Sequence, residues 1–75
     1  MKVQEIADQA DMIVAGYAYK VQDNYIEITD LSNITKTAVI QNDELVESVM
    51  SDEEDNIVMK YYNRNKDLLK ESLNA

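Results

Sequence analysis

Four consecutive carboxylates, Asp52, Glu53, Glu54 and Asp55, are the residues of this chain whose type and spacing could do chemistry. Carboxylate oxygens are the ligands that calcium and magnesium prefer. However, consecutive residues in the first turn of a helix point outward in a fan and do not converge on one ion. The glycine and the DxDxDG spacing of an EF-hand loop are also missing. We therefore expect no bound metal here, and a divalent-cation binder is among the least favoured functions.

Ser51 gives these carboxylates a structural explanation. Ser51 and Glu54 match a capping box, in which the serine hydroxyl caps one free amide and the glutamate side chain reaches back to another. The acidic residues of such a first turn also face the positive end of the helix dipole. The apolar residues that follow fall on one broad face, so we predict an amphipathic C-terminal helix of about 20 residues.

The residue types present do not favour catalysis. The chain has no histidine and no cysteine, so its serines lack the commonest activating base. Glu27 and Asp30 could form a carboxylate pair for acid–base work, although neighbouring carboxylates are more often a solvated strand edge. No glycine-rich loop is present that would hold a nucleotide. We therefore expect no cofactor and no enzymatic activity, and a small enzyme is only a minor alternative.

The length and charge of the chain limit its architecture and its partners. Its 75 residues form one domain, 1–75, with a thin core that self-association would help to stabilise. The net charge of −8 repels phosphate backbones, which argues against direct nucleic-acid binding, and it attracts basic surfaces. The longest apolar run is too short to cross a bilayer, and the first residues lack an apolar signal-peptide core. We expect a cytoplasmic protein that binds no membrane.

Two segments open the predicted fold. The apolar residues Val3, Ile6 and Ala7 recur at helical spacing, which predicts an N-terminal helix. Residues 12–21 are rich in β-branched and aromatic types and read as one strand. Gly16 lies inside this strand, where we interpret it as a bulge or as a place where a helix comes close to the backbone.

Three further segments complete an antiparallel meander. Residues 25–31 alternate between apolar and polar types, and residues 36–41 are rich in strand-forming types. Asn42-Asp43 suits a hairpin turn into a strand over 44–50, and a short helix over 44–50 is the other interpretation. The predicted class is therefore α+β, with an N-terminal helix, an antiparallel meander of three or four strands, and the long amphipathic helix packed on one sheet face.

The contact between the C-terminal helix and the sheet can be predicted in outline. The residues expected to meet come from the helix stripe and from the inward face of the sheet: Ile57, Tyr61, Leu68, Ile26, Ile28 and Val39.

Eight residues are candidates for protein binding, as tyrosines at half-buried positions or as acidic residues of the stretch 43–55. They are Tyr25, Tyr62, Asp43, Glu44, Glu47, Asp52, Glu53 and Asp55. The turn and the helix start could lie within a Debye length of about 8–10 Å and act as one negative patch for a basic partner. Turn and capping chemistry is the structural interpretation of the same residues. We expect neutralisation of Asp43 or Glu47 to stabilise the fold, since neither draws on the helix dipole.

Four short sequence segments, taken in their order along the chain, resemble a group of known proteins. The pieces are "ADMIVAGYAY", "YIEITDLSN", "TAVIQNDELVES" and "MSDEEDNIVMKYYNRNKDLL", and together they span nearly the whole sequence. In this order they resemble small uncharacterised acidic proteins of Gram-positive bacteria and their phages or conjugative elements. The resemblance implies an α+β domain without an assigned function, and it brings no catalytic or binding residues.

These observations favour non-enzymatic protein binding, either to a separate protein partner or to a second copy in a homodimer. An acidic inhibitor from a mobile element, occupying a nucleic-acid-binding site of a host protein, is the first alternative. A small divalent-cation binder or enzyme is the second.

Overall fold

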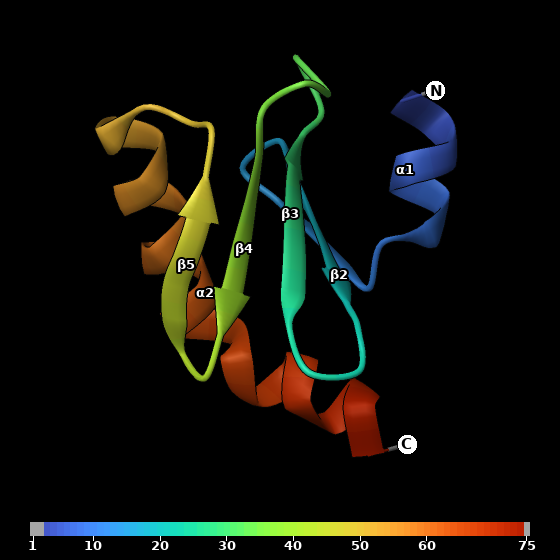
Figure 1. Cartoon of the computed structure of the whole chain (residues 1–75). Coiled ribbons are helices and arrows are strands. Elements are labelled where there is room, and N and C mark those ends of the chain that lie inside the picture. The colour runs from blue at the N-terminus through green and yellow to red at the C-terminus, as the bar shows by residue number, and fades with distance from the viewer. Residues whose placement is uncertain (1–2, 75) are drawn as a thin grey trace.

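The computed structural model describes residues 3–74, and side chains from residue 3 to residue 69, as one five-stranded sheet with two helices (Figure 1). The elements are α1 (Val3–Gln9), β1 (Met12–Val14), β2 (Tyr17–Val21), β3 (Ile26–Asp30), β4 (Thr37–Gln41), β5 (Glu44–Ser48) and α2 (Asp52–Asn74). The sheet order β1-β2-β3-β4-β5 follows the chain, and every neighbouring pair is antiparallel. This confirms the predicted α+β class. Among the described residues, neither helix combines the length and the apolar character that crossing a bilayer requires.

The fifth strand arises because residues 12–21 form two strands, and the prediction of one strand was wrong. β1 and β2 pair through a two-residue turn at Ala15-Gly16. Both turn residues have positive φ, 54° and 81°, as a hairpin turn of type I′ requires. Gly16 adopts this φ without strain, whereas an alanine rarely does. Ala15 therefore gives no sequence signal for a turn within this apolar run. No heavy atom lies within 4 Å of where a Cβ of Gly16 would be, so backbone conformation rather than space favours glycine.

The second hairpin is formed as predicted. Asn42 and Asp43 have φ of 55° and 65°, and the segment that follows is strand β5 rather than a helix. The two strands are not in simple register, because Val39 lies opposite Glu47 while the next residue of β4 lies opposite Leu45. The extra residue of β5 between these pairs is Val46, which forms a β-bulge.

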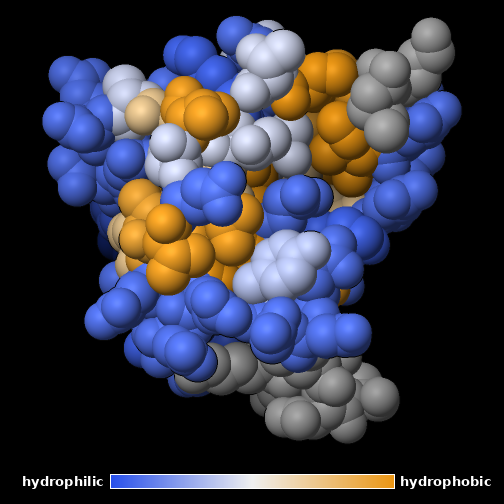
Figure 2. All heavy atoms as spheres, viewed as in Figure 1, coloured by the Kyte–Doolittle hydropathy of each residue, from blue (hydrophilic) through white to orange (hydrophobic). Residues whose placement is uncertain are grey.

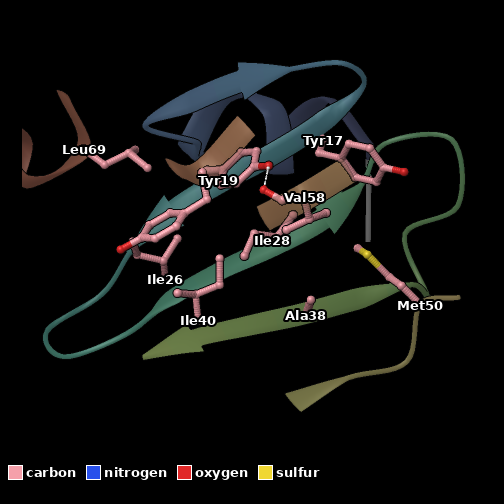
Figure 3. Close-up of a cluster of buried hydrophobic side chains, with 10 residues drawn as sticks. Tyr17, Tyr19, Ile26, Ile28, Ala38, Ile40, Met50, Val58 and Leu69 are labelled. Carbon is pink, nitrogen blue, oxygen red and sulfur yellow. Dashed lines mark hydrogen bonds between the residues drawn. The ribbon is translucent and has the colours of Figure 1, made fainter. Parts of the chain in front are cut away.

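α2 covers one face of the sheet and buries the core against it (Figure 3). Tyr19, Ile28 and Ala38 form a row across β2, β3 and β4, and each is at most 1% exposed. The Tyr19 hydroxyl donates a hydrogen bond of 2.8 Å to the carbonyl oxygen of Val58, which fixes α2 to the centre of the sheet. Burial raises the pKa of this phenol above its ordinary value.

The rotation of α2 about its axis differs from the predicted one. Val58, Tyr62 and Leu69 are buried against the sheet. Ile57 and Leu68, which were expected there, are 38% and 62% exposed. Both groups belong to one broad apolar stripe, and periodicity alone does not say which edge of such a stripe the sheet covers.

Candidate functional site

The face of the sheet turned away from α2 is covered only in part. α1 lies over β2 and β3, where Ile6 and Gln9 help to line a gap of about 250 Å³ beside Ala18 and Thr29. Ala18 alternates with the core residues of β2, so this gap is on the opposite face from α2. Farther along, between β3 and β5, Figure 2 shows apolar side chains interrupted by hydrophilic ones.

Six side chains line a shallow hollow of about 350 Å³ in this uncovered region, which we call the open face: Tyr25, Glu27, Val39, Gln41, Val46 and Glu47. The register explains the grouping, because Glu27 lies opposite Val39 and Val39 lies opposite Glu47. Two strand spacings put the Cα atoms of the two glutamates about 10 Å apart, with the valine between them. Val39 therefore points away from α2, and its predicted place in the helix contact was wrong.

The β-bulge of β5 shapes the open face. In a regular strand, neighbours such as Val46 and Glu47 would point to opposite faces of the sheet. At the bulge both side chains line the same hollow. Val46 is 53% exposed, so the bulge presents an apolar side chain beside a carboxylate.

The carboxylates of the open face have no partner among the described residues. Glu27 and Glu47 are exposed, and neither takes part in a described hydrogen bond or ion pair. Lys20 lies opposite Glu27 on β2, but its ammonium group donates to the carbonyl oxygen of Gln9 at 3.2 Å. Glu44 is also exposed and adds a third carboxylate at the hairpin end of β5.

Tyr25 separates this hollow from a second one of about 270 Å³ at the hairpin end of the sheet. Tyr25 is 37% exposed and lines both hollows. Tyr62 also lines the second hollow, but it is only 2% exposed and its hydroxyl donates to the carboxylate of Asp43. Burial, and then this hydrogen bond, raise the pKa of the Tyr62 phenol. The expected role of Tyr62 as a partner contact is thus corrected, because its ring is a core group that fastens the hairpin turn to α2.

The acidic stretch 43–55 does not form one patch. Asp43 precedes β5, whereas Asp52 and Glu53 follow it at the start of α2. The five residues of β5 put these ends about 17 Å apart, and Figure 1 shows them at opposite ends of the sheet. This exceeds the Debye length of about 8–10 Å at physiological salt. The expected single patch is therefore two separate groups.

A polar network fastens the start of α2 to the sheet; we call Tyr17, Asp30, Lys36, Ser51 and Glu54 the helix-start network. The amide of Glu54 donates to the Ser51 hydroxyl at 3.2 Å, and the Ser51 amide donates to the Glu54 carboxylate at 3.4 Å, which confirms the capping box. The same carboxylate pairs with Lys36 at 3.1 Å and accepts from the Tyr17 hydroxyl at 3.4 Å. The hydrogen bonds from Lys36 and Ser51 hold the pKa of Glu54 below its ordinary value.

Asp30 extends the helix-start network into the sheet. It is 8% exposed and accepts hydrogen bonds from the amide and hydroxyl of Ser32 at 2.9 and 2.6 Å. Burial raises the pKa of Asp30, but the Ser32 hydrogen bonds, with contributions from Glu54 and Lys36, outweigh it and lower the pKa. Asp30 and Glu27 point to opposite faces of β3, so they do not form the carboxylate pair considered for acid–base work.

The remaining acidic candidates lie around the start of α2. Asp52 and Glu53 are exposed, and Asp55 accepts a hydrogen bond of 2.5 Å from the Ser48 hydroxyl. Within the described part of the chain, no three carboxylates gather in an arrangement that could hold a metal ion. These three candidates therefore lie apart from the open face and from Tyr25.

Comparison with known proteins identifies a family without identifying a function. The model of a family of unknown function (DUF7723) matches residues 1–69. The chain belongs to this family. No curated protein and no solved structure matches it. The expected resemblance is thus confirmed as far as membership of a family that has no assigned function, and the open face must be interpreted from its own chemistry.

Four residues of the open face were not among the predicted candidates: Glu27, Val39, Gln41 and Val46. The alternation in 25–31 and 36–41 already contained the signal for the first three, because it assigns them to one face with Tyr25. Val46 could not be found in this way, since a bulge is not visible in the hydrophobic pattern. As a group, these side chains offer apolar contact and negative charge to a partner.

Proposed function

We propose that this domain is a non-enzymatic protein-binding module that uses the open face to bind a separate protein, with the cytoplasm as its compartment. The observation that supports this proposal is the exposure of Tyr25 and Val46 around a hollow flanked by two carboxylates without partners. α2 already buries the core on the other face of the sheet. Apolar side chains grouped with aromatic ones on a remaining surface are typical of an interaction site.

A second copy of the chain is a weaker occupant of this face. Two open faces stacked together would bring Glu27 and Glu47 of one copy against the same residues of the other, and such like-charge contacts are costly. Of the described cations, Lys20 lies opposite Glu27 but donates to the carbonyl oxygen of Gln9. Lys60 and Arg64 flank the Tyr61 ring on α2. Homodimerisation remains a prediction from the thin core, and we propose that it does not use the open face.

The acidic inhibitor of a nucleic-acid-binding protein is less well supported. That function calls for a continuous negative surface, and the stretch 43–55 is divided between the two ends of β5. The open face offers a mixture of apolar and acidic groups instead.

Site-specific photo-crosslinking in the native cells tests the proposal. A photoreactive residue at position 46 reports on the open face, and one at position 68 is the matched control, because Val46 and Leu68 are exposed to similar extents on opposite sides of the molecule. We expect a discrete protein adduct from position 46 and none from position 68. Equal labelling at both positions, or at neither, would contradict binding through the open face.

Light scattering during size exclusion separates a partner from a second copy. We expect Val46→Glu to leave the mass of the particle unchanged at every concentration, because self-association does not involve this surface. If the protein is a dimer and Val46→Glu dissociates it, the open face is the homodimer interface.

A further inference from the structure

Glu27 and Glu47 of the open face form no hydrogen bond or ion pair with a described residue, although Lys20 lies opposite Glu27 on β2. Five described carboxylates accept hydrogen bonds within the fold: Asp11, Asp30, Asp43, Glu54 and Asp55. Glu27 and Glu47 instead flank Val39 with no described partner. Both carboxylates are exposed, so each is accessible to a cation of another molecule.

Glu27, Val39 and Glu47 form a row across β3, β4 and β5, which determines the spacing between the two negative charges. Adjacent strands are about 4.8 Å apart, so the two carboxylates start from backbone positions about 10 Å from each other. Val39, in the middle, and Val46, at the bulge, form the apolar floor between them. The complement of this row is a cation, an apolar side chain and a second cation.

Resting on the proposed function, we infer that the open face binds a basic amphipathic helix of its protein partner, with Lys or Arg side chains over Glu27 and Glu47 and an apolar side chain over Val39. Positions i and i+7 of a helix are about 10.5 Å apart, and i+3 and i+4 lie between them on the same face. In a strand, same-face positions are about 6.8 or 13.5 Å apart. The helical repeat is the closer match to the spacing of the two glutamate Cα atoms, and we take a helix as the occupant.

The charge balance of the chain agrees with a basic occupant. A net charge of −8 attracts a cationic segment over a distance and raises its association rate. Tyr25, at the border of the hollow, adds an aromatic ring that an Arg side chain can stack on.

A peptide titration followed by NMR tests the inference. The probe is a synthetic helical peptide with Arg at i and i+7 and Leu at i+3 and i+4, added to the whole ¹⁵N-labelled chain. We expect the amide signals of β3, β4 and β5 near Glu27, Val39 and Glu47 to shift most, and those of α2 to shift least. A peptide with Gln in place of both Arg residues should bind at least about tenfold more weakly.

Paired variants separate a specific site from general attraction to an acidic protein. Glu27→Gln with Glu47→Gln should weaken peptide binding about tenfold or more. Asp52→Asn with Glu53→Gln changes the net charge by the same amount at exposed positions at the start of α2, off the open face, and should change binding less than about twofold. Equal weakening by the two pairs, or shifts spread over all acidic regions, would overturn the inference.

The outcomes for the proposed function and for this inference are distinguishable. If crosslinking at position 46 yields no partner, the proposed function fails. If the adduct forms and persists in the Glu27→Gln, Glu47→Gln variant, the open face binds a protein but the basic complement is wrong. A peptide that binds only as an extended strand would also overturn the inference.

Discussion

The helix-start network and the open face both contain carboxylates, but these are hydrogen-bonded in the first region and have no described partner in the second. Asp30 and Glu54 each accept hydrogen bonds from neighbouring groups, and Glu54 also pairs with Lys36. Glu27 and Glu47 have no described partner, although they lie on the same sheet. Carboxylates that are satisfied within the fold contribute to its stability, whereas those without partners remain available to another molecule.

The largest expected change in stability comes from a comparison of two acidic residues of β3. Asp30→Ala removes a nearly buried acceptor and leaves the Ser32 groups without their partner, so it should lower the free energy of unfolding by about 2 kcal/mol. Glu27→Ala, three residues earlier in β3, should change it by less than about 0.5 kcal/mol. Urea unfolding measures both. Similar losses for the two variants would show that the open face is also structural.

A smaller effect is expected at the helix cap. Ser51→Ala removes the hydroxyl that accepts the Glu54 amide, and it should lower the free energy of unfolding by about 1 kcal/mol. Asn56→Ala, at an exposed position one turn into α2, should instead stabilise slightly because alanine is the better helix former. Thermal melts of the two variants give the comparison. A harmless Ser51→Ala would remove the capping box from the helix-start network.

Acid should weaken the helix-start network. The pKa values of Asp30 and Glu54 are lowered in the folded state from ordinary values of 3.8 and 4.5. A lowered pKa means that the folded state binds these protons less readily than the unfolded one. The stabilisation is therefore fully present above the ordinary values and is lost as the pH falls below them.

The pH dependence of unfolding checks this assignment. Urea unfolding between neutral pH and about pH 3 should show a decline that begins near the ordinary carboxyl pKa values. The decline should be shallower in Asp30→Asn. An unchanged slope in Asp30→Asn would show that other carboxylates cause the acid sensitivity.

The smallest effect is expected on the open face. Glu47→Gln should raise the free energy of unfolding by a few tenths of a kcal/mol, because it removes one negative charge from a chain of net charge −8 without breaking a described bond. The sequence suggested the same for Asp43, but Asp43 accepts a hydrogen bond from Tyr62. Asp43→Asn should therefore destabilise. Salt titration of the parent and Glu47→Gln, with stabilisation by salt reduced in the variant, would sharpen this result.

The sequence predicted the fold well because each main element carries its own local signal. The capping box at Ser51 and the turn at Asn42-Asp43 are chemical signals of this kind, and both are confirmed. The turn at Ala15-Gly16 lacks such a signal, since alanine gives no indication of positive φ. The rotation of α2 about its axis could not be predicted from the hydrophobic pattern either, because the sheet can cover either edge of a broad apolar stripe.

The candidate site was less predictable because it depends on contacts between elements. Tyr25 and Glu47 were chosen from residue type, and the sheet brings them to one hollow. Tyr62 was chosen by the same reasoning, and the rotation of α2 buries it. The bulge at Val46 is set by strand pairing, which periodicity of one strand does not contain. Register, more than composition, decides which side chains share the open face.

The strand order of the sheet follows the order of the chain throughout. Each strand can therefore meet its neighbour by closing a short loop, which keeps the native pairings local and favours rapid folding. α2 cannot reach its place in this way, because Tyr19 and the Val58 carbonyl that it bonds are 39 positions apart. We expect the hairpins to form first, and the slow step of folding to be the docking of α2 on a sheet that is already assembled.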